Sequence, residues 1–264
     1  MATAVVRYGA MGTHESFSPP DDEIKVGMHV VVRTPRGVEW GEVVKINHSD
    51  NGRERSDGEI LRAATSADYE KQRDIVENVE GEEFKRCKQF IAKHGLPMKL
   101  RAVEHLFGGH KIIFYFMADG RVDFRGLVRD LAKEYRTRIE MRQIGVRDEA
   151  RMMGLFGPCG RELCCRRFLN SLKPVPMKLA KDQKSTLDPA KISGSCGRLK
   201  CCLRYEEKMY KELKKKLPRR GTKVTTAGGD GTVVDYYILS QTVTVEMEDG
   251  GRQRLSLSEI ERKE

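Results

Sequence analysis

Hydrophobic residues recur along the chain with two different periods. Between residues 24 and 46, and again from residue 221 onward, short apolar or alternating runs are separated by Gly, Pro and Asp, a pattern typical of β-strands and turns. Between residues 66 and 91, and again after Asp123, apolar residues recur at helical spacing. Further strands are predicted at 98–106, 111–117 and 138–142. The order of helix, two strands, helix and strand predicts an α+β layer domain.

Composition divides the chain into five regions. The first 22 residues are polar and contain Pro19 and Pro20, so we expect a flexible tail there. Short strands with Gly-rich turns predict small SH3-like β modules on either side of the central helix and sheet domain. The predicted regions are a tail over 1–22, an N-terminal β module over 23–63, an α+β domain over 64–150, a duplicated cysteine-rich metal-binding segment over 151–217, and a C-terminal SH3-like β-barrel module over 218–264.

A duplicated motif contains six of the seven cysteines. Residues 157–168 read Gly-Pro-Cys-Gly-Arg-Glu-Leu-Cys-Cys-Arg-Arg-Phe, and residues 194–205 read Gly-Ser-Cys-Gly-Arg-Leu-Lys-Cys-Cys-Leu-Arg-Tyr. Both copies follow Gly-x-Cys-Gly-Arg-x-x-Cys-Cys-x-Arg-aromatic, which is too specific for chance and indicates a duplicated site. The repeated cysteines are Cys159, Cys164, Cys165, Cys196, Cys201 and Cys202.

The spacing of these thiols favours metal ligation. Glycines on both sides of the first cysteine let the backbone turn tightly, which brings a sulfur five residues later back toward the same centre. A single zinc ion accepts a vicinal cysteine pair poorly, and no histidine lies between Arg151 and Arg220. A 4Fe-4S cluster takes thiolates from varied positions and normally uses four of them. Each triplet is one thiol short, so either both triplets combine around one centre or partner chains donate the missing ligands. We expect 4Fe-4S clusters shared with partner chains, with zinc as the alternative.

Positive charge is concentrated around the cysteines. The chain has a net charge of +10, and the segment from Arg151 to Arg220 has 19 Lys or Arg against 6 Asp or Glu. The basic run within 198–220 is either a solvated helix face or a contact for RNA or an acidic partner. Four arginines recur in the motif and are expected to offset the negative charge of a cluster and its thiolates. They are Arg161, Arg167, Arg198 and Arg204.

Two other roles for the cysteines stay open. Buried cysteines are often ordinary small hydrophobic residues, and we expect this of Cys87, which shares a helix face with Phe84 and Ile91. For the six repeated cysteines, packing alone does not require the duplicated Gly and Arg. Reversible oxidation of the vicinal thiols would make the chain a redox sensor. A zinc-stabilised RNA-binding module is a further alternative.

Several other classes of protein are disfavoured. The chain has no run of 18 apolar residues and its amino end lacks the order of a secretory signal, so we expect a cytoplasmic protein with reduced thiols. The Gly-rich turn at 227–231 is not followed by the Lys-Ser/Thr of a phosphate-binding loop. No His-Glu-x-x-His motif and no serine nucleophile motif is present, and no histidine is paired by sequence with a cysteine. We therefore expect a protein that is not an enzyme.

At these residues the chain resembles the YaaT/RicT family, whose members carry the PSP C-terminal domain. The resemblance extends from about Ile24 into the last β module. The segments that carry it are 114–116 (Phe-Tyr-Phe), 119–124 (Asp-Gly-Arg-Val-Asp-Phe), 136–139 (Arg-Thr-Arg-Ile), 142–148 (Arg-Gln-Ile-Gly-Val-Arg-Asp) and both cysteine motifs.

The resemblance implies a role in a complex. YaaT/RicT proteins assemble with two small helical proteins, YlbF and YmcA, into a complex that carries two 4Fe-4S clusters. This complex works with the membrane-anchored endoribonuclease RNase Y in mRNA maturation, and sporulation depends on it. For this chain the resemblance implies a non-catalytic scaffold that YlbF-like and YmcA-like partners complete and that a partner recruits to the membrane.

Overall fold

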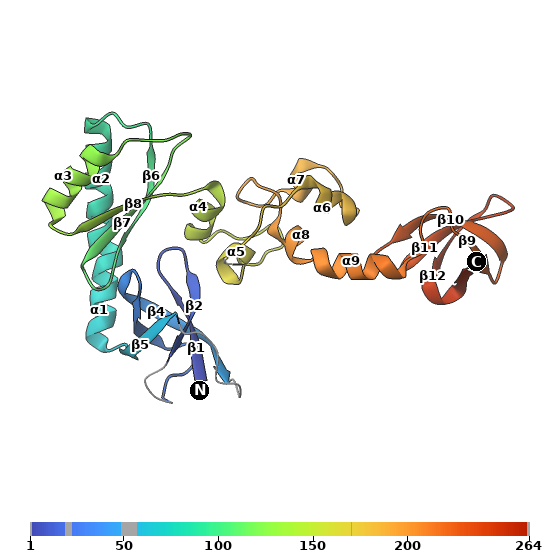
Figure 1. Cartoon of the computed structure of the whole chain (residues 1–264), viewed down its shortest axis with the longest axis horizontal. Coiled ribbons are helices and arrows are strands. Elements are labelled where there is room, and N and C mark those ends of the chain that lie inside the picture. Colours follow the sequence, from blue (N-terminus) through green and yellow to red (C-terminus); the bar gives the residue numbers. More distant parts are fainter. Residues whose placement is uncertain (1, 19–22, 49–56, 170, 263–264) are drawn as a thin grey trace. The chain divides into compact units, whose positions relative to one another are not determined.

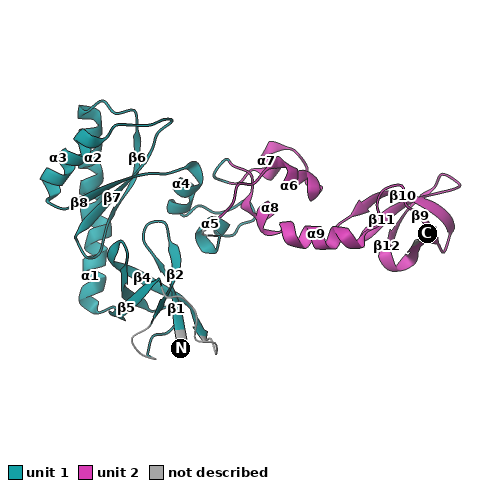
Figure 2. Cartoon of the chain, viewed as in Figure 1, with its two compact units in different colours: residues 1–171, 195–197 teal, residues 172–194, 198–264 magenta. Residues whose placement is uncertain are grey.

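The computed structural model describes residues 2–18, 23–48, 57–169 and 171–262. The chain forms two compact units (Figure 2). Unit 1 comprises residues 1–171 and 195–197, and unit 2 comprises residues 172–194 and 198–264. The boundary between the units therefore passes through the second cysteine motif. Mixed helices and sheets in the whole chain agree with the predicted α+β class (Figure 1).

The amino end of unit 1 is a closed five-stranded barrel with the strand order β1-β2-β5-β3-β4. Its strands are β1 (Ala2–Tyr8), β2 (Thr13–Ser18), β3 (His29–Thr34), β4 (Gly37–His48) and β5 (Gly58–Ala63). The strands and turn predicted within 24–46 are confirmed as the antiparallel hairpin of β3 and β4. The prediction of a flexible tail over 1–22 is wrong for residues 2–18, because β1 pairs with both β2 and β4. Residues 19–22 lie outside the described residues.

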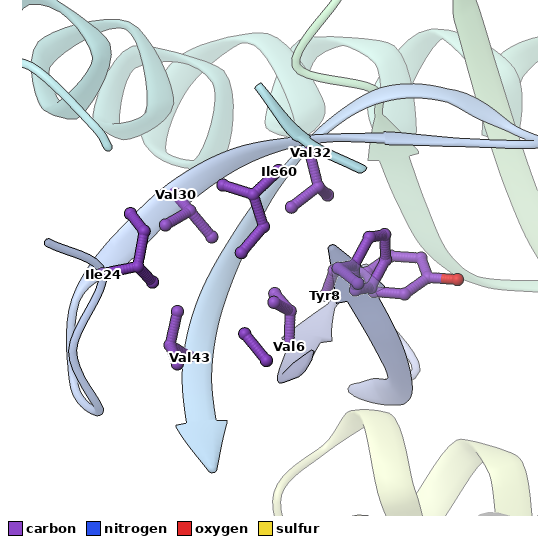
Figure 3. Packing of buried hydrophobic residues seen from close by; sticks show 9 residues of the cluster. Val6, Tyr8, Ile24, Val30, Val32, Val43 and Ile60 are labelled. Atoms are coloured by element: carbon purple, nitrogen blue, oxygen red, sulfur yellow. The ribbon is translucent and has the colours of Figure 1, made fainter. Parts of the chain in front are cut away.

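Burial of alternate side chains explains why the first strands join the barrel. Ala4, Val6 and Tyr8 point to one side of β1 and are at most 5% exposed, and Phe17 of β2 is fully buried. Figure 3 shows Val6 and Tyr8 in the same core as Val30, Val43 and Ile60. Gly41 lets β1 approach β4 closely, because a Cβ at this position would lie 2.5 Å from Val6 Cγ1.

The second part of unit 1 is a layer domain, in which a three-stranded sheet packs against helices on one face. The sheet order is β6-β7-β8, with β6 antiparallel and β8 parallel to β7, as expected for the predicted layer domain. The strands are β6 (Lys99–His105), β7 (Lys111–Met117) and β8 (Arg138–Gln143), and the helices are α2 (Glu80–Lys93) and α3 (Arg125–Tyr135). Cys87 and Ile91 of α2 and Leu127 and Leu131 of α3 pack against Phe114 and its neighbours. On the opposite face, Ile113 and Tyr115 pack with Met11 from the β1–β2 turn.

The long helix predicted over 66–91 contains a π-helical turn. It begins as α1 (Ser66–Asp74), widens at Ile75–Val79 and continues as α2. Thr65 and Asp68 form a capping box at its start, which pairs the first backbone N–H groups. The wider turn admits one extra residue, and such turns are rare outside functional or strained segments.

A buried ion-pair network joins the barrel to the layer domain. Arg36, in the β3–β4 turn, lies with its guanidinium 2.7 Å from Glu104 Oε1 of β6 and 3.4 Å from Glu39 Oε2 of β4. Tyr115 donates to Glu104, the backbone N–H of Ala10 also donates to it, and Thr34 donates to Glu39. The carboxylates are almost fully buried, with 8% of the Glu104 side chain and 3% of the Glu39 side chain exposed. Burial raises the pKa of Glu39 to about 7.

Unit 2 ends in a five-stranded antiparallel sheet with the order β12-β11-β10-β9-β13. The strands are β9 (Lys223–Thr226), β10 (Gly229–Tyr237), β11 (Thr242–Met247), β12 (Arg252–Ser256) and β13 (Ile260–Arg262), with a 3-10 turn at Leu257–Glu259. Helix α9 (Glu207–Lys216) packs Tyr210 and Leu213 against the core of this sheet. The strands predicted from residue 221 onward are confirmed. The SH3-like character of both β modules stays a prediction.

Short helices occupy the segment between the layer domain and α9. They are α4 (Val146–Met152), α5 (Cys164–Arg167), α6 (Met177–Asp182), α7 (Pro189–Ile192) and α8 (Cys201–Tyr205). Leu179, Ile192 and Leu203 form a small core in unit 2. In the described part of the chain, no helix combines the length and the apolar character needed to cross a bilayer.

Candidate metal-binding loops

The two cysteine motifs have the same backbone conformation. Each begins with an isolated antiparallel bridge, between Phe156 and Glu162 in the first copy and between Ser193 and Leu199 in the second. The N–H of the first motif glycine donates to the carbonyl of the motif arginine at 2.8 Å in both copies. The glycine after the first cysteine has a positive φ of 73° at Gly160 and 75° at Gly197. Glycine is required there because this conformation strains other residues.

The vicinal cysteines start a short helix in each copy. Cys164 and Cys165 open α5, and Cys201 and Cys202 open α8. The residue before each helix is extended in the same way, with φ −55° and ψ 130° at Leu163 and φ −55° and ψ 128° at Lys200. The sequence repeat is therefore also a repeat of local structure, which presents three thiols from one tight turn and one helix start.

The six thiols differ in exposure. Cys159 is exposed, Cys165 is buried, and the other four are half-buried. Burial, followed by the charge of Glu206, raises the pKa of Cys202. Among the residues that the structure describes, no three His, Cys, Asp or Glu side chains are grouped so that they could hold a metal ion. The thiol chemistry fits a soft metal or cluster.

The boundary between the units separates the thiols of the second motif. Cys196 belongs to unit 1, together with Cys159, Cys164 and Cys165. Ser195 Oγ donates to the carbonyl of Phe156 at 2.7 Å, which fixes the second turn beside the first motif. Cys201 and Cys202 belong to unit 2. The division of the thiols between the units is thus four and two, although the sequence repeat is three and three.

The repeated arginines lie in different environments. Arg161, Arg167 and Arg198 are exposed. Arg204 instead donates to Glu207 at 2.6 Å and to the carbonyl of Pro174, so its charge is used within unit 2. A charge-compensating role of these four residues stays a prediction.

Large apolar side chains are exposed beside both motifs, which the sequence analysis did not single out. Met153 and Phe156 are 66% and 65% exposed in unit 1. The aromatic residue that ends the motif is exposed in both copies, by 47% at Phe168 and 61% at Tyr205. The repeated aromatic position at the end of each motif could have indicated this surface in the sequence. Exposed aromatic residues are typical of contact surfaces.

Cys87 is a packing residue, as predicted. It is fully buried between Ile91 and the sheet, and burial raises the pKa of its thiol to about 12. It therefore provides an internal reference for thiol chemistry in this chain.

Comparison with known proteins identifies the family. Residues 58–144 match the PSP1 C-terminal conserved region, and residues 174–217 match the third domain of PSP1-like proteins. The chain is 47% identical over 247 residues to the Stage 0 sporulation protein YaaT of Bacillus subtilis (strain 168), across 92% of this chain and 88% of that protein. The chain belongs to the YaaT family. The resemblance that the motifs indicated is thus confirmed over almost the whole chain.

A eukaryotic protein shares part of the YaaT-family sequence. An uncharacterized protein of Schizosaccharomyces pombe is 30% identical over 154 residues, across 46% of this chain and 20% of that protein. No solved structure matches the chain. Both region matches fall on elements described above, from β5 to β8 and from the segment before α6 to α9.

Proposed function

We propose that this chain is a non-catalytic regulatory scaffold that binds 4Fe-4S clusters together with helical partner proteins. The observation that supports the proposal is the pair of loops with the same backbone conformation, each of which presents three thiols. An iron-sulfur cluster needs four thiolates or equivalent ligands, so a partner that supplies the rest would couple metal binding to assembly. The bound cluster would stabilise the assembled state, and the chain's own loops would orient the thiols.

The exposed apolar residues support completion by a partner. Met153, Phe156 and Phe168 accompany the first motif, and Tyr205 accompanies the second. Covering such side chains removes apolar surface from water, which favours association by about 25 cal/mol per Å² of buried apolar area. In agreement with the family resemblance, we propose YlbF-like and YmcA-like helical proteins as these partners.

The proposed biological role is regulation of mRNA processing. The Bacillus relative is named for stage 0 of sporulation, and we extend a regulatory role of that kind to this chain. RNase Y is the proposed nuclease partner, and the basic segment 198–220 is the proposed contact for RNA. The scaffold itself would work in the cytoplasm and reach the membrane through a partner.

Serine substitution of the motif cysteines tests the metal-binding proposal. For the chain purified without oxygen together with its partners, we expect stoichiometric iron and sulfide and a visible absorption band. The double variant Cys164→Ser and Cys201→Ser should lose most of this iron, because a hydroxyl is a poor cluster ligand. Iron, zinc and sulfide analysis measures the result, and Cys87→Ala is the matched control that removes a thiol outside the motifs.

The possible outcomes separate the alternatives. Stoichiometric zinc without sulfide would favour the zinc-stabilised RNA-binding module over the iron-sulfur scaffold. Absence of both metals, with reversible oxidation of the vicinal thiols, would favour the redox sensor. Equal iron in the double variant and in Cys87→Ala would contradict ligation by the motifs.

Substitution of an exposed aromatic residue tests completion by a partner. Phe156→Ser removes a side chain that is 65% exposed and keeps the backbone carbonyl that accepts from Ser195. We expect the dissociation constant for the partner proteins to rise about ten-fold or more, as at interface hot spots. Val26→Ser is the control, because Val26 is 59% exposed in the segment before β3 and lies outside both cysteine motifs. An equal effect of both substitutions on binding in solution would refute a specific contact at Phe156.

A further inference from the structure

Unit 2 carries an exposed tyrosine with an arginine stacked on its ring. Tyr237, the last residue of β10, is 42% exposed, and the guanidinium carbon of Arg254 lies 3.9 Å from its ring centroid. Arg254 Nε donates to Thr242 Oγ1 at 3.0 Å and Nη2 donates to Ser240 Oγ at 3.1 Å. These hydroxyls hold the guanidinium plane in place without neutralising it. In the part of the chain that the structure describes, no carboxylate forms an ion pair with Arg254.

More cations surround this stacked pair. Lys184 Nζ lies 4.1 Å from the ring centroid of Tyr236 and 5.9 Å from that of Tyr237. Asp235 accepts from both Lys184 and Arg220, so one carboxylate serves two cations. The β10–β11 turn adds Leu239, which is 61% exposed.

The C-terminal end of α9 adjoins the same surface. Gln241 Nε2 donates to the carbonyls of Leu213 in α9 and Ile238 in the turn, which joins the two elements. Lys214, Lys215 and Lys216 end the helix and are exposed. Between Lys208 and Lys223 the sequence has eight Lys or Arg and a single Glu. One or two cations at a helix C-terminus are enough to compensate the helix dipole. The excess of Lys and Arg in this segment is larger than that compensation requires.

We propose that this surface of unit 2 binds single-stranded RNA, with a base stacked on the Tyr237–Arg254 pair and the phosphates on the lysines of α9. Single strands are bound by a basic surface that follows the backbone and by aromatic or guanidinium planes that stack with unpaired bases. An acidic peptide would use the lysines but gains nothing from an exposed ring plane. The surface comprises Lys184, Lys214, Lys215, Tyr237, Leu239 and Arg254.

The inference deepens the proposed function by naming the residues of the RNA contact, and it does not require the cysteine loops. It rests on the proposed function only for the choice of RNA over single-stranded DNA. The surface lies wholly in unit 2 (Figure 2). RNA binding is therefore expected to be the same in the wild type and in the Cys164→Ser, Cys201→Ser variant.

Fluorescence anisotropy of the full chain with a labelled single-stranded RNA of about 15 nucleotides tests the inference. Tyr237→Ala should weaken binding on the order of ten-fold through loss of one stacked base, whereas Tyr237→Phe should bind like the wild type. Arg254→Lys keeps the charge and loses the plane, so it should also weaken binding several-fold. Changing Lys214 and Lys215 together to Gln should lower the slope of log affinity against log salt by about 1.4, from about 0.7 for each phosphate contact.

Controls separate stacking, charge and folding. Lys88→Gln removes an exposed lysine from α2 in unit 1 and should leave the affinity unchanged. Thermal unfolding checks each variant, and Arg254→Lys carries the test if Tyr237→Ala does not fold. Wild-type affinity of both Tyr237→Ala and Arg254→Lys would overturn the inference. So would a glutamate-rich peptide that binds the wild type while the RNA does not, because an acidic protein would then be the partner. Wild-type iron content in the Cys164→Ser, Cys201→Ser variant, together with the expected loss of RNA binding in Tyr237→Ala, would refute the metal proposal alone.

Discussion

The Phe17→Ala variant is expected to lose about 3 to 5 kcal/mol of the free energy of unfolding of unit 1. Phe17 is fully buried in the barrel core, and its ring meets Tyr8 edge-on with 5.7 Å between centroids. Truncation leaves a cavity that the closed barrel cannot fill by collapse. Urea unfolding followed by tryptophan fluorescence measures the loss, because Trp40 is the single tryptophan of the chain and lies in β4.

Val26→Ala is the matched control for this experiment. Val26 is 59% exposed, so its truncation should change the unfolding free energy by no more than about 0.5 kcal/mol. Equal midpoints for Phe17→Ala and the wild type would show that β2 does not belong to the folded barrel, and the first 18 residues would then behave as the tail that their polarity suggested.

The Arg36→Met variant is expected to cost about 3 to 5 kcal/mol at pH 8, because it leaves Glu39 and Glu104 buried without their cation. The cost should shrink at pH 5.5, where Glu39 takes up a proton and no longer needs a positive partner. Replacing Glu39 by Gln in the same variant should recover part of the loss at pH 8. The measurement is again the urea midpoint reported by Trp40 at the two pH values.

The wild-type protein should itself become less stable as pH rises from about 5 to 8. Burial raises the pKa of both Glu39 and Glu80 to about 7, and the hydrogen bond to Glu83 raises the pKa of His105. The folded state therefore binds more protons than the unfolded state in this range, so the unfolding free energy falls with pH. For Glu39, a rise of the pKa from 4.5 to about 7 corresponds to up to about 3 kcal/mol.

Glu39→Gln should flatten this pH dependence, whereas Glu59→Gln should not. Glu59 pairs with Arg33 at the surface and its side chain is 51% exposed, so this ion pair contributes little to stability. Carboxyls whose pKa is lowered, such as Asp68 and Asp235, are ionised in both states above pH 5 and do not contribute here. A flat or rising stability between pH 5 and 8 would contradict the buried state of Glu39.

Elements with local signals were predictable from the sequence. Examples are the β3–β4 hairpin, the β6–β7 hairpin and helix α3. In each of them the apolar residues recur with the period of the element, and turn residues mark its ends. The motif glycines also indicated tight turns, and the positive φ at Gly160 and Gly197 agrees with that reason. These features depend on residues within about ten positions in the sequence, so the local sequence is enough to predict them.

Features that depend on distant partners were not predictable. The first strand gains its place by pairing with β4, some 40 residues away. The ion-pair network likewise joins Arg36 to Glu104, which look like ordinary surface charges in the sequence. The assignment of Cys196 to unit 1 could not be read from a repeat that treats all three thiols alike.

The π-helical turn at Ile75–Val79 fixes the rotational register of everything after it. Each residue added to or removed from a helix turns the following side chains by about 100° about its axis. Deleting one residue of this turn would restore ordinary helix but swing Cys87 and Ile91 away from Phe114, and Glu83 away from His105. This segment should therefore resist changes in length, even though Val76, Glu77 and Asn78 lie at the surface and tolerate changes of side chain.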